Sequence, residues 1–405
     1  MADIGQLTGT IKYYDWGGSE FIPSLLGITE KEDRPYAEYW LGVHPQADCT
    51  VVFPNGEKIS LKQQIANDKT GSLGKDVADR FGTMPYLLKA LDVKDMLSIQ
   101  VHPSKEAAVK DFAAENEKGI PLDSPARNYK DDNHKPELMV AMDEFWLLHG
   151  FKPSSEMEDI LSYVPELLFL LPVFNMSGYE GLYKMVMEMP QADVNERLQP
   201  LLDRILPPYK EGLLDVTTED FWAAKGSLTF SEPGRIDRGI FSVYLFNLVQ
   251  LRRGESVFQD AGVPHAYLSG QNVEIMASSD NVLRGGLTRK HIDVPELLRH
   301  VKCEPTYPHI LKGETNGQQL VYKTPAPDFE LSGYSLAKGE ITTVLPTTAE
   351  ILLLVSGEAE LSSKDGNISI KKGQPAAVLF PGNGISIKAK EATVFYRASV
   401  PGTDK

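Results

Sequence analysis

The sequence predicts a mainly β protein that is interrupted by one block of helices. Short apolar runs, bounded by Gly, Pro and polar turns, fill the first 151 residues and resume near Phe241. This pattern is typical of small antiparallel β-barrels. Between the two stretches, apolar residues recur at helical spacing. We therefore predict three domains: a discontinuous β domain (1–151 and 226–312), a helical insertion (152–225) and a C-terminal β domain (313–405).

The first β domain contains the clearest strand signals. The stretch "PYLLKALDVKDMLSIQVHPS" predicts strands at 86–92 and 96–102, joined by a polar turn at Lys94-Asp95. After the helical block, "FSVYLFNLVQL" from Phe241 predicts a further strand, and "RRGESVFQDAGVPHAYL" follows with more turn signals. Strands and turns in this order favour an antiparallel barrel whose rim carries the turns.

The helical insertion shows start signals and an apolar stripe. Ser155 with Glu158 resembles a capping box, and Asp193 is placed to cap a later helix. That later helix carries one apolar stripe, formed by Val194, Leu198, Leu201, Leu202 and Ile205. A short helix is also predicted at 293–301, outside the insertion.

The last part of the chain repeats the strand pattern. Residues 350–363, 367–381 and 384–398 predict short strands separated by Gly and Pro. No histidine follows His309. We therefore expect this β domain to be structural and to lack a metal site.

Composition and charge exclude several kinds of partner. The chain has 405 residues, a formal net charge of -15 and only two cysteines, Cys49 and Cys303. A strongly negative field disfavours nucleic acid and anionic membranes, and two cysteines form no disulfide framework but suit a reducing cytosol. The chain starts without a signal peptide, and its longest apolar run is too short to span a bilayer. We expect a cytoplasmic protein without a nucleic-acid or membrane partner, either monomeric or weakly self-associating.

Four polar residues near strands form a candidate metal site. Gln100 and His102 are two apart on a predicted strand and therefore share a face. His265 leads a second apolar stretch, and Glu137 begins a third. Nitrogen and oxygen donors of these types suit zinc and similar divalent ions. The alternative for Gln100 and His102 is a half-buried strand with a wet polar face. Glu274, flanked by apolar residues, would need a partner if it is buried.

A second polar stretch holds a candidate anion clamp. In "SSDNVLRGGLTRKH", Arg284, Arg289 and Lys290 lie close together, and Gly285-Gly286 lets the backbone turn sharply. The cations that could join them are Lys89, Lys135, Arg252 and Arg253. The alternative is a basic loop in solvent.

Several motifs in order resemble the type I phosphomannose isomerases, metal enzymes of the cupin superfamily. They are "YDWGG…PYAEYWLGVHP", "QVHPS", "DDNHKPEL", "VPHAYLSG" and "EIMASSDNVLRGGLTRKHIDVPEL". The resemblance covers residues 8–150 and 235–305 well, and elsewhere extends to the architecture alone. It implies two cupin-type, jelly-roll barrels plus the helical domain. It also implies one zinc ion per chain, bound by Gln100, His102, Glu137 and His265.

The resemblance further implies a sugar-phosphate pocket. Arg284 is implied as essential, and Lys135 and Glu274 are implied as lining the pocket; we assign these two residues to catalysis as well. The substrate-binding residues that we assign on this basis are Lys89, Ser98, His134, Tyr267, Asp280 and Lys290. The chain departs from the family at Arg289, where proline is common before the lysine.

The implied reaction interconverts mannose 6-phosphate and fructose 6-phosphate. A proton moves between C2 and C1 of the open-chain sugar through a cis-enediol. The base stays open among Glu274, whose pKa burial would raise, Lys135 and His134, while Arg284 would stabilise charge. The alternatives are a metal-dependent cupin enzyme acting on another sugar or sugar phosphate, and a non-catalytic sugar-binding regulator.

Overall fold

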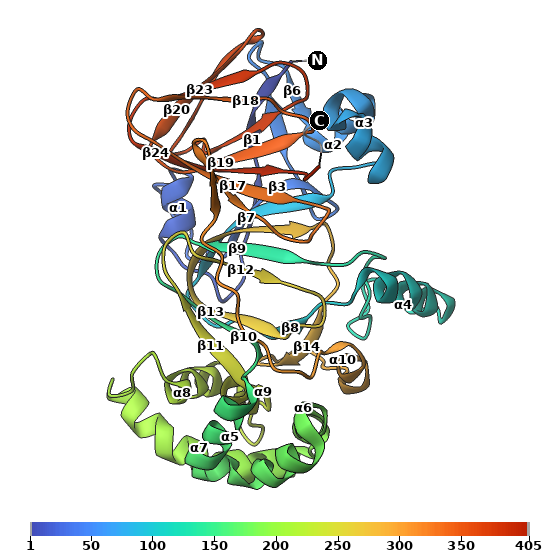
Figure 1. The fold of residues 1–405 in the computed structure, drawn as a ribbon, viewed down its shortest axis with the longest axis vertical. Helices are drawn as coiled ribbons and strands as arrows, with labels where there is room; N and C mark the ends of the chain where they lie inside the picture. Colours follow the sequence, from blue (N-terminus) through green and yellow to red (C-terminus); the bar gives the residue numbers. More distant parts are fainter. Residues whose placement is uncertain (1, 403–405) are drawn as a thin grey trace.

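Three regions are stacked along the long axis of the molecule in the computed structural model, which describes residues 2–402. Figure 1 shows a β region that includes the C-terminal strands at the top, a central β region, and a bundle of helices at the bottom. The sheets are antiparallel throughout the paired strands named below. Among residues 2–402, no helix combines the length and apolar character that a membrane crossing needs.

The central region is built on an eleven-stranded sheet, in which strand β13 has the most neighbours. Strand β13 pairs with β7, β8, β9 and β10, so it brings together segments that lie far apart in the sequence. The strands of this sheet are β2 (Thr10–Lys12), β3 (Glu38–His44), β4 (Ala47–Asp48), β7 (Tyr86–Val93), β8 (Ile99–Val101), β9 (Glu137–Ala141), β10 (Phe145–Phe151), β11 (Phe246–Leu251), β12 (Ser256–Gln259), β13 (His265–Ala277) and β14 (Leu283–Gly286). The predicted strands at 86–92 and 96–102 are confirmed as β7 and β8.

The upper region contains a nine-stranded and a four-stranded sheet. The nine-stranded sheet consists of β15 (Glu314–Asn316), β16 (Gln319–Tyr322), β17 (Glu330–Leu336), β24 (Thr393–Ser399), β19 (Glu350–Ser356), β22 (Ala376–Leu379), β1 (Ile4–Thr8), β5 (Thr50–Val52) and β6 (Lys58–Ser60). The four-stranded sheet consists of β18 (Ile341–Val344), β23 (Ile385–Ala389), β20 (Glu358–Ser363) and β21 (Gly366–Lys371). The predicted C-terminal strands are therefore confirmed.

Two sequence-distant segments share the nine-stranded sheet. Strand β1 pairs with β22 in the register Ile4↔Leu379, so the start of the chain completes a sheet made mainly by its end. The two upper sheets pack over one apolar core, to which Leu352 and Phe395 contribute from the larger sheet and Leu361 and Ile387 from the smaller.

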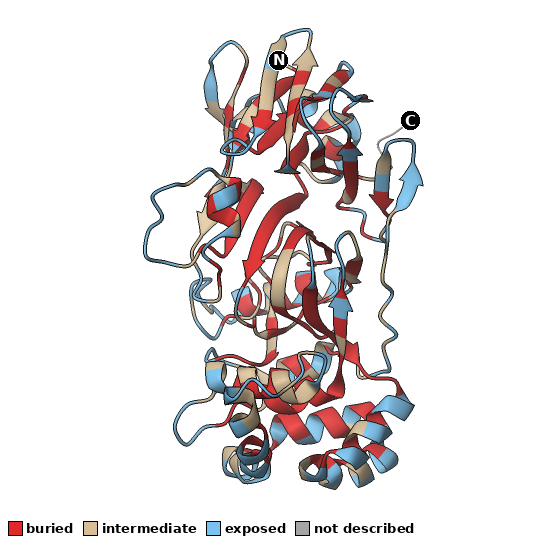
Figure 2. Ribbon diagram, turned by 90° about the vertical axis from the view of Figure 1, so that its left-hand side faces the viewer, coloured by how far each residue is buried: buried red, intermediate tan, exposed pale blue. Residues whose placement is uncertain are grey.

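The helices flank the sheets and form the lower region. They are α1 (Phe21–Leu25), α2 (Leu61–Asn67), α3 (Lys69–Arg80), α4 (Lys105–Glu117), α5 (Ser154–Tyr163), the 3-10 helix η1 (Pro165–Leu170), α6 (Leu171–Glu188), α7 (Gln191–Lys210), α8 (Glu219–Phe230), α9 (Gly239–Leu245) and α10 (Val294–His300). All five residues of the predicted apolar stripe on α7 are buried. Figure 2 shows the same division elsewhere, with buried residues along the central strands and exposed ones on the outer sides of the helices.

Three local predictions are wrong. Helices α5 and α7 begin after Pro153 and Pro190 without a side-chain cap, so neither Ser155 nor Asp193 is a capping residue. Proline fixes the backbone just ahead of each helix, and Asp193 lies in the first turn, where the helix dipole favours it. The strand predicted from Phe241 begins only at Phe246, because the preceding residues form α9. All seven residues of α9 are buried, and periodicity cannot distinguish such an apolar run from a buried strand.

Tyr86 connects the central and upper regions. Its side chain is fully buried on β7, and its hydroxyl lies 3.0 Å from the carbonyl oxygens of both Ala349 and Ala398.

Tyr86→Phe should therefore lower the free energy of unfolding by about 1–2 kcal/mol, because a buried carbonyl loses its donor. Urea unfolding measures this change. Tyr163→Phe, at an exposed position, is the control, and equal effects of the two substitutions would contradict the prediction.

Candidate metal centre

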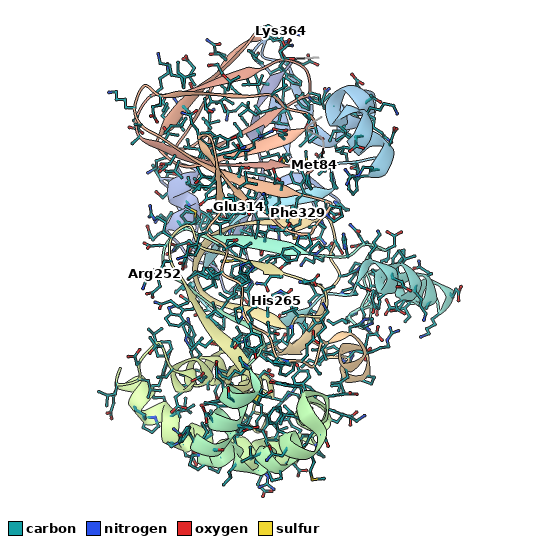
Figure 3. The ribbon with its side chains drawn as sticks, viewed as in Figure 1. Met84, Arg252, His265, Glu314, Phe329 and Lys364 are labelled. Atoms are coloured by element: carbon teal, nitrogen blue, oxygen red, sulfur yellow. The ribbon has the colours of Figure 1, made fainter. Side chains whose placement is uncertain are left out.

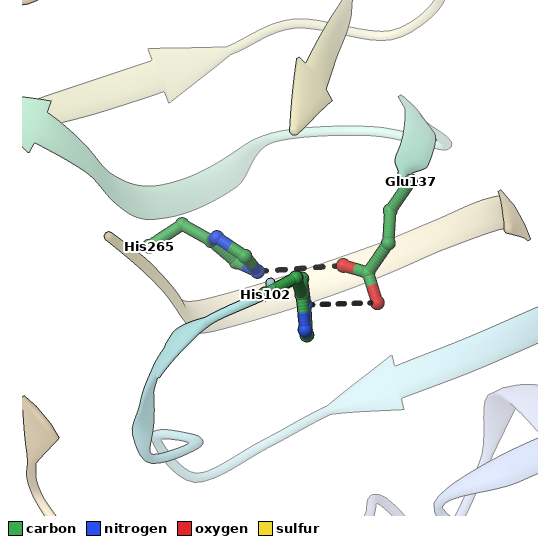
Figure 4. A group of neighbouring side chains, drawn as sticks. All are labelled: His102, Glu137 and His265. Atoms are coloured by element: carbon green, nitrogen blue, oxygen red, sulfur yellow. Dashed lines mark ion pairs between the residues drawn. The ribbon is translucent and has the colours of Figure 1, made fainter. Parts of the chain in front are cut away.

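Three buried side chains converge in the central region. His102 follows β8, Glu137 begins β9 and His265 begins β13, and their candidate ligand atoms all lie within 4.8 Å of one another. Glu137 Oε1 is 3.5 Å from His102 Nε2, and Glu137 Oε2 is 3.4 Å from His265 Nε2 (Figure 4). Two ligands placed about 2.1 Å from a tetrahedral ion would be about 3.4 Å apart. The spacing therefore fits side chains that share one ion.

Both imidazoles are oriented for metal binding. His102 Nδ1 lies 2.8 Å from the carbonyl oxygen of Asn281, and His265 Nδ1 lies 3.0 Å from that of Val263. A carbonyl oxygen only accepts, so each Nδ1 carries the proton and each Nε2 presents its lone pair. Neither buried Nε2 has a hydrogen-bond partner among the described residues. Two Nε2 lone pairs without hydrogen-bond partners fit a divalent ion, which both nitrogens could bind.

The local electrostatics also favour the metal-binding protonation states. Burial lowers the pKa of His102 to about 4, so the imidazole is neutral at neutral pH. Burial alone would raise the pKa of Glu137, but the Lys135 ammonium, 3.1 Å from Oε1, opposes this effect, and the pKa lies well below its usual range. Neutral histidine and ionised carboxylate are the forms that bind metals.

Gln100 lies at the same place. It lines a small cavity of about 70 Å³ together with Glu137 and His265. Strand pairing explains its position, because Gln100 is the cross-strand partner of His265 on one side and of Arg284 on the other. The structure thus brings together all four predicted metal ligands.

The other wall of this cavity carries a buried charge network. Lys89 Nζ lies 3.0 Å from Glu274 Oε1 and 3.8 Å from Glu38 Oε2, and the Tyr267 hydroxyl donates to Glu274 Oε2 at 2.7 Å. The register of β13, β7 and β3 produces this group, because Lys89 is the partner of Glu274 and of Trp40. Glu38 was not predicted. The pattern that identified Glu274, a carboxylate between apolar neighbours in the sequence, also occurs at Glu38 and could have identified it.

Each charge in this network depends on its partners. Burial, with the carboxylates of Glu137 and Glu38, raises the pKa of Glu274 despite the opposing Lys89 ammonium. Burial would lower the pKa of Lys89, but Glu274 and Glu38 outweigh it and the pKa rises. We conclude that Lys89 stays charged and that Glu274 binds a proton more readily than an ordinary carboxylate does.

The other predicted basic and substrate-binding residues differ in their burial and in their contacts. Arg284 is half-buried beside Gln100, and burial lowers its pKa. Lys290 is exposed, and burial of part of its side chain together with the Arg284 charge lowers its pKa. Asp280 lies 3.4 Å from His44 Nε2 through Oδ1. Ser98, one residue before β8, is half-buried and does not line the small cavity as the described residues define it.

Two predicted cations are not brought to the site. Arg252 and Arg253 are exposed in the turn before β12. The register of β9 and β12 pairs Glu137 with Gln259 and Val140 with Ser256, so this turn lies at the end of β9 opposite Glu137. Figure 3 shows Arg252 at the edge of the molecule, away from His265.

The polar loop before Glu137 is fastened by Asn281, which is fully buried. Asn281 Oδ1 accepts from the backbone N–H groups of Lys130 and Asp131, and Nδ2 donates to the carbonyl oxygens of Asp131 and Asn133. The backbone carbonyl of the same residue holds His102. One residue thus positions both a candidate ligand and the loop that leads to another.

His134 faces away from the cavity. Its Nε2 lies 2.8 Å from Oδ2 of Asp328, a buried residue between β16 and β17 of the nine-stranded sheet. His134 is absent from the described residues that line the cavity. Figure 3 shows the neighbouring Phe329 where the upper and central regions meet.

The chain is similar to known enzymes along nearly all of its length. Residues 4–154 match the family described as phosphomannose isomerase type I, catalytic domain. Mannose-6-phosphate isomerase of Salmonella typhimurium is 38% identical over 380 residues, covering 92% of this chain and 94% of that protein. The Escherichia coli enzyme of the same name is 35% identical over 389 residues, covering 95% and 96%. A solved structure of the Salmonella enzyme, bound to its substrate and to zinc, superposes with a TM-score of 0.88 at 33% identity, covering 98% and 100%.

A buried imidazole near the site makes stability depend on pH. Burial lowers the pKa of His149 to about 4, against about 6.5 for an ordinary histidine. Between these values the unfolded chain binds more protons, so stability falls as the pH falls, by up to about 1.4 kcal/mol per pH unit. We expect His149→Gln to flatten this fall in metal-free protein, as measured by urea unfolding at several pH values. His309→Gln, at an exposed position, is the control, and an unchanged slope in His149→Gln would contradict the assignment.

Proposed function

The chain belongs to the type I phosphomannose isomerase family, and we propose that it interconverts mannose 6-phosphate and fructose 6-phosphate with the aid of zinc. The observation that carries this proposal is the convergence of His102, Glu137 and His265, with unpartnered Nε2 atoms, beside the Lys89–Glu274 pair. The near full-length similarity to mannose-6-phosphate isomerases supports it.

We propose the finer architecture on the same basis. The two β regions would be cupin-type barrels, with domains at 1–151 and 226–312, 152–225, and 313–405. Two observations bear on these boundaries. Helical residues continue to Leu245, and β1 pairs with β22 of the upper region. Segments at domain edges are thus shared between neighbouring sheets.

One zinc ion would be held by Gln100, His102, Glu137 and His265. Bound there, it would supply a Lewis acid that polarises a sugar oxygen. The donor set contains one carboxylate, and the remaining ligands are neutral. Gln100 is included because it lines the cavity with Glu137 and His265.

Proton transfer is assigned to Glu274 and Lys135. Glu274 takes the proton from C2 of the open-chain aldose, while the Lys135 ammonium gives a proton to O1, which yields the cis-enediol. Lys135 then takes the proton from O2, and Glu274 returns its proton to C1, which yields the ketose. Glu274 and Lys135 line the same cavity as Glu137 and His265, which supports this assignment, and the upward shift of the Glu274 pKa is in the direction that favours a general base.

Other residues would position the substrate and stabilise charge. The Arg284 guanidinium would stabilise negative charge on the enediol oxygens. Lys290 at the rim would bind the phosphate, and Asp280, held by His44, would accept from a sugar hydroxyl. We keep Lys89, Ser98 and Tyr267 as further substrate contacts. The partner is thus a small sugar phosphate, and we propose a cytoplasmic monomer without nucleic-acid or membrane partners.

His134 is assigned to positioning instead of proton transfer. Asp328 is buried, and among the described residues its carboxylate is paired with His134. Burying a carboxylate without a partner is costly, so this contact ties the loop to the upper β region. Only Lys135 and Pro136 separate His134 from Glu137, and proline restricts the backbone. Anchoring His134 therefore places both Lys135 and Glu137.

Metal removal tests the proposed reaction. We expect the metal-loaded protein to convert mannose 6-phosphate to fructose 6-phosphate, to lose this activity on verified zinc removal, and to regain it with zinc. His265→Ala should lower both zinc content and kcat/KM, the latter at least about a hundredfold, the upper range for altered partners of metal ligands. Elemental analysis and a coupled assay measure the two quantities, with His309→Gln as control. No turnover by the loaded protein, or preference for unphosphorylated mannose, would contradict the proposal.

Asp328→Asn tests the positioning role of His134. The substitution keeps the shape and removes the charge, and we expect kcat/KM to fall between about tenfold and a hundredfold, because small displacements of catalytic groups are costly. Adding His134→Gln should cost little more, since both changes break one contact. Glu391→Gln, at an exposed position in the upper region, is the control. Additive losses in the double variant would show that Asp328 does not act through His134.

A further inference from the structure

A second and larger cavity opens in the upper β region. Its volume is about 540 Å³, against about 70 Å³ at the candidate metal centre, and the two cavities share no lining residue among those that the structure describes. Strands β16, β17 and β24 of one upper sheet and β18 of the other line the cavity, so it lies between the two sheets. A volume of about 300–1,000 Å³ is typical of small-molecule sites.

The floor of the cavity is rigid and apolar. Tyr334 and Val344 line it and also belong to the core that joins the two sheets. The Tyr334 ring stacks on Phe395, with ring centroids 4.7 Å apart and planes within 8°. The Tyr334 hydroxyl donates to Gln319 Oε1 at 2.8 Å. Contacts therefore fix both the face and the hydroxyl of this ring.

A buried ion pair reaches the cavity from the same side. Arg397 Nε and Nη2 donate to the Glu350 carboxylate at 2.6 and 2.8 Å, and Glu350 is fully buried. Such a pair seldom stabilises a fold more than apolar residues of the same size. The pair therefore places a polar group, with its charge already matched, on the wall of the cavity.

The lining selects the chemical class of that ligand. Arg397 is the only charged residue that lines the cavity within residues 2–402, and its charge is matched by Glu350 in a two-point contact. Hydroxyl and amide groups make up most of the remaining wall, namely those of Thr342, Thr343, Thr347, Asn316, Gln318 and Gln319. Anions would find no uncompensated cation, whereas a hydroxyl-rich molecule would find donors and acceptors above an aromatic floor.

We propose that this cavity is a second ligand site, which binds a neutral polyhydroxylated molecule of hexose size. The neutral wall distinguishes it from the candidate active site, where Arg284 and Lys290 favour a phosphate. The proposal does not depend on the isomerase reaction, since none of the proposed catalytic residues lines this cavity.

Ligand-observed NMR on the full chain tests the site. The probes are D-mannitol, D-glucitol and methyl α-D-mannopyranoside, none of which has a free carbonyl group for isomerisation. We expect saturable binding of at least one probe with a dissociation constant on the order of 1 mM. The absence of saturable binding for all three would overturn the proposal.

Variants locate the bound probe. Gln319 is half-buried on β16 and is the cross-strand partner of Tyr334, so Gln319→Trp places an indole ring beside Tyr334 in the cavity, and aromatic cross-strand pairs are favourable. It should weaken binding at least about tenfold, or about 1.4 kcal/mol. Thr315→Trp, on exposed strand β15 and outside the lining, is the matched control and should bind normally. Thr342→Val, which removes one lining hydroxyl at similar volume, is a second variant if Gln319→Trp fails to fold.

Two comparisons separate this site from the candidate active site. Arg284→Gln should bind the polyol normally, and Gln319→Trp should isomerise mannose 6-phosphate normally. Loss of polyol binding in Arg284→Gln, or unchanged binding in both cavity variants, would place the probe elsewhere and overturn the proposal. Tighter binding of D-mannitol 6-phosphate than of D-mannitol in the cavity would overturn the neutral class. Failure of the isomerase assay alone would leave these results standing.

Discussion

Buried charge is the constraint on which the central β region depends. Glu38, Glu137 and Glu274 are buried together and face the ammonium groups of Lys89 and Lys135. With every group ionised, three carboxylates and two ammonium groups leave one negative charge. Charges of this kind are costly in a protein interior unless they are paired. A divalent ion between Glu137 and the two neutral imidazoles would reverse the sign and leave a cationic site, which suits an anionic sugar phosphate.

Strand β13 makes this arrangement possible. It begins with His265 and carries Glu274 nine residues later, and its pairing with β7 and β9 sets Lys89 and Met139 opposite that carboxylate. Register determines which side chains meet, because a shift of one residue would turn each of them to the other face. The candidate metal centre and the Lys89–Glu274 pair are thus two parts of one strand alignment.

The loop from Lys130 to Lys135 connects the candidate metal centre to both β regions. Asn281 holds it from the central region, and Asp328 holds it from the upper region. An upper region without a metal cluster of its own among the described residues therefore still contacts the candidate active site. The same region holds the larger cavity.

The sequence by itself determined the strand-rich character and the helical block, and it predicted four metal ligands that the structure brings together. Periodicity and motif spacing depend only on residues that are close together in the chain, so they can be recognised from the sequence alone. It also identified Glu274, because a carboxylate between apolar residues signals burial. Local signals failed at α9, where complete burial removes the periodic pattern, and at the two helix starts, where proline set the boundary.

Only the tertiary structure decided the long-range relations. Glu38 joins Lys89 through the β3–β7 register, β1 completes a sheet with β22, and His134 turns to Asp328, 194 residues away in the sequence. Arg252 and Arg253 resemble members of the basic cluster in the sequence, yet strand register places them at the far end of β9. Each of these outcomes depends on how strands pair across the chain, and the free energy of pairing is shared among residues that no local pattern connects.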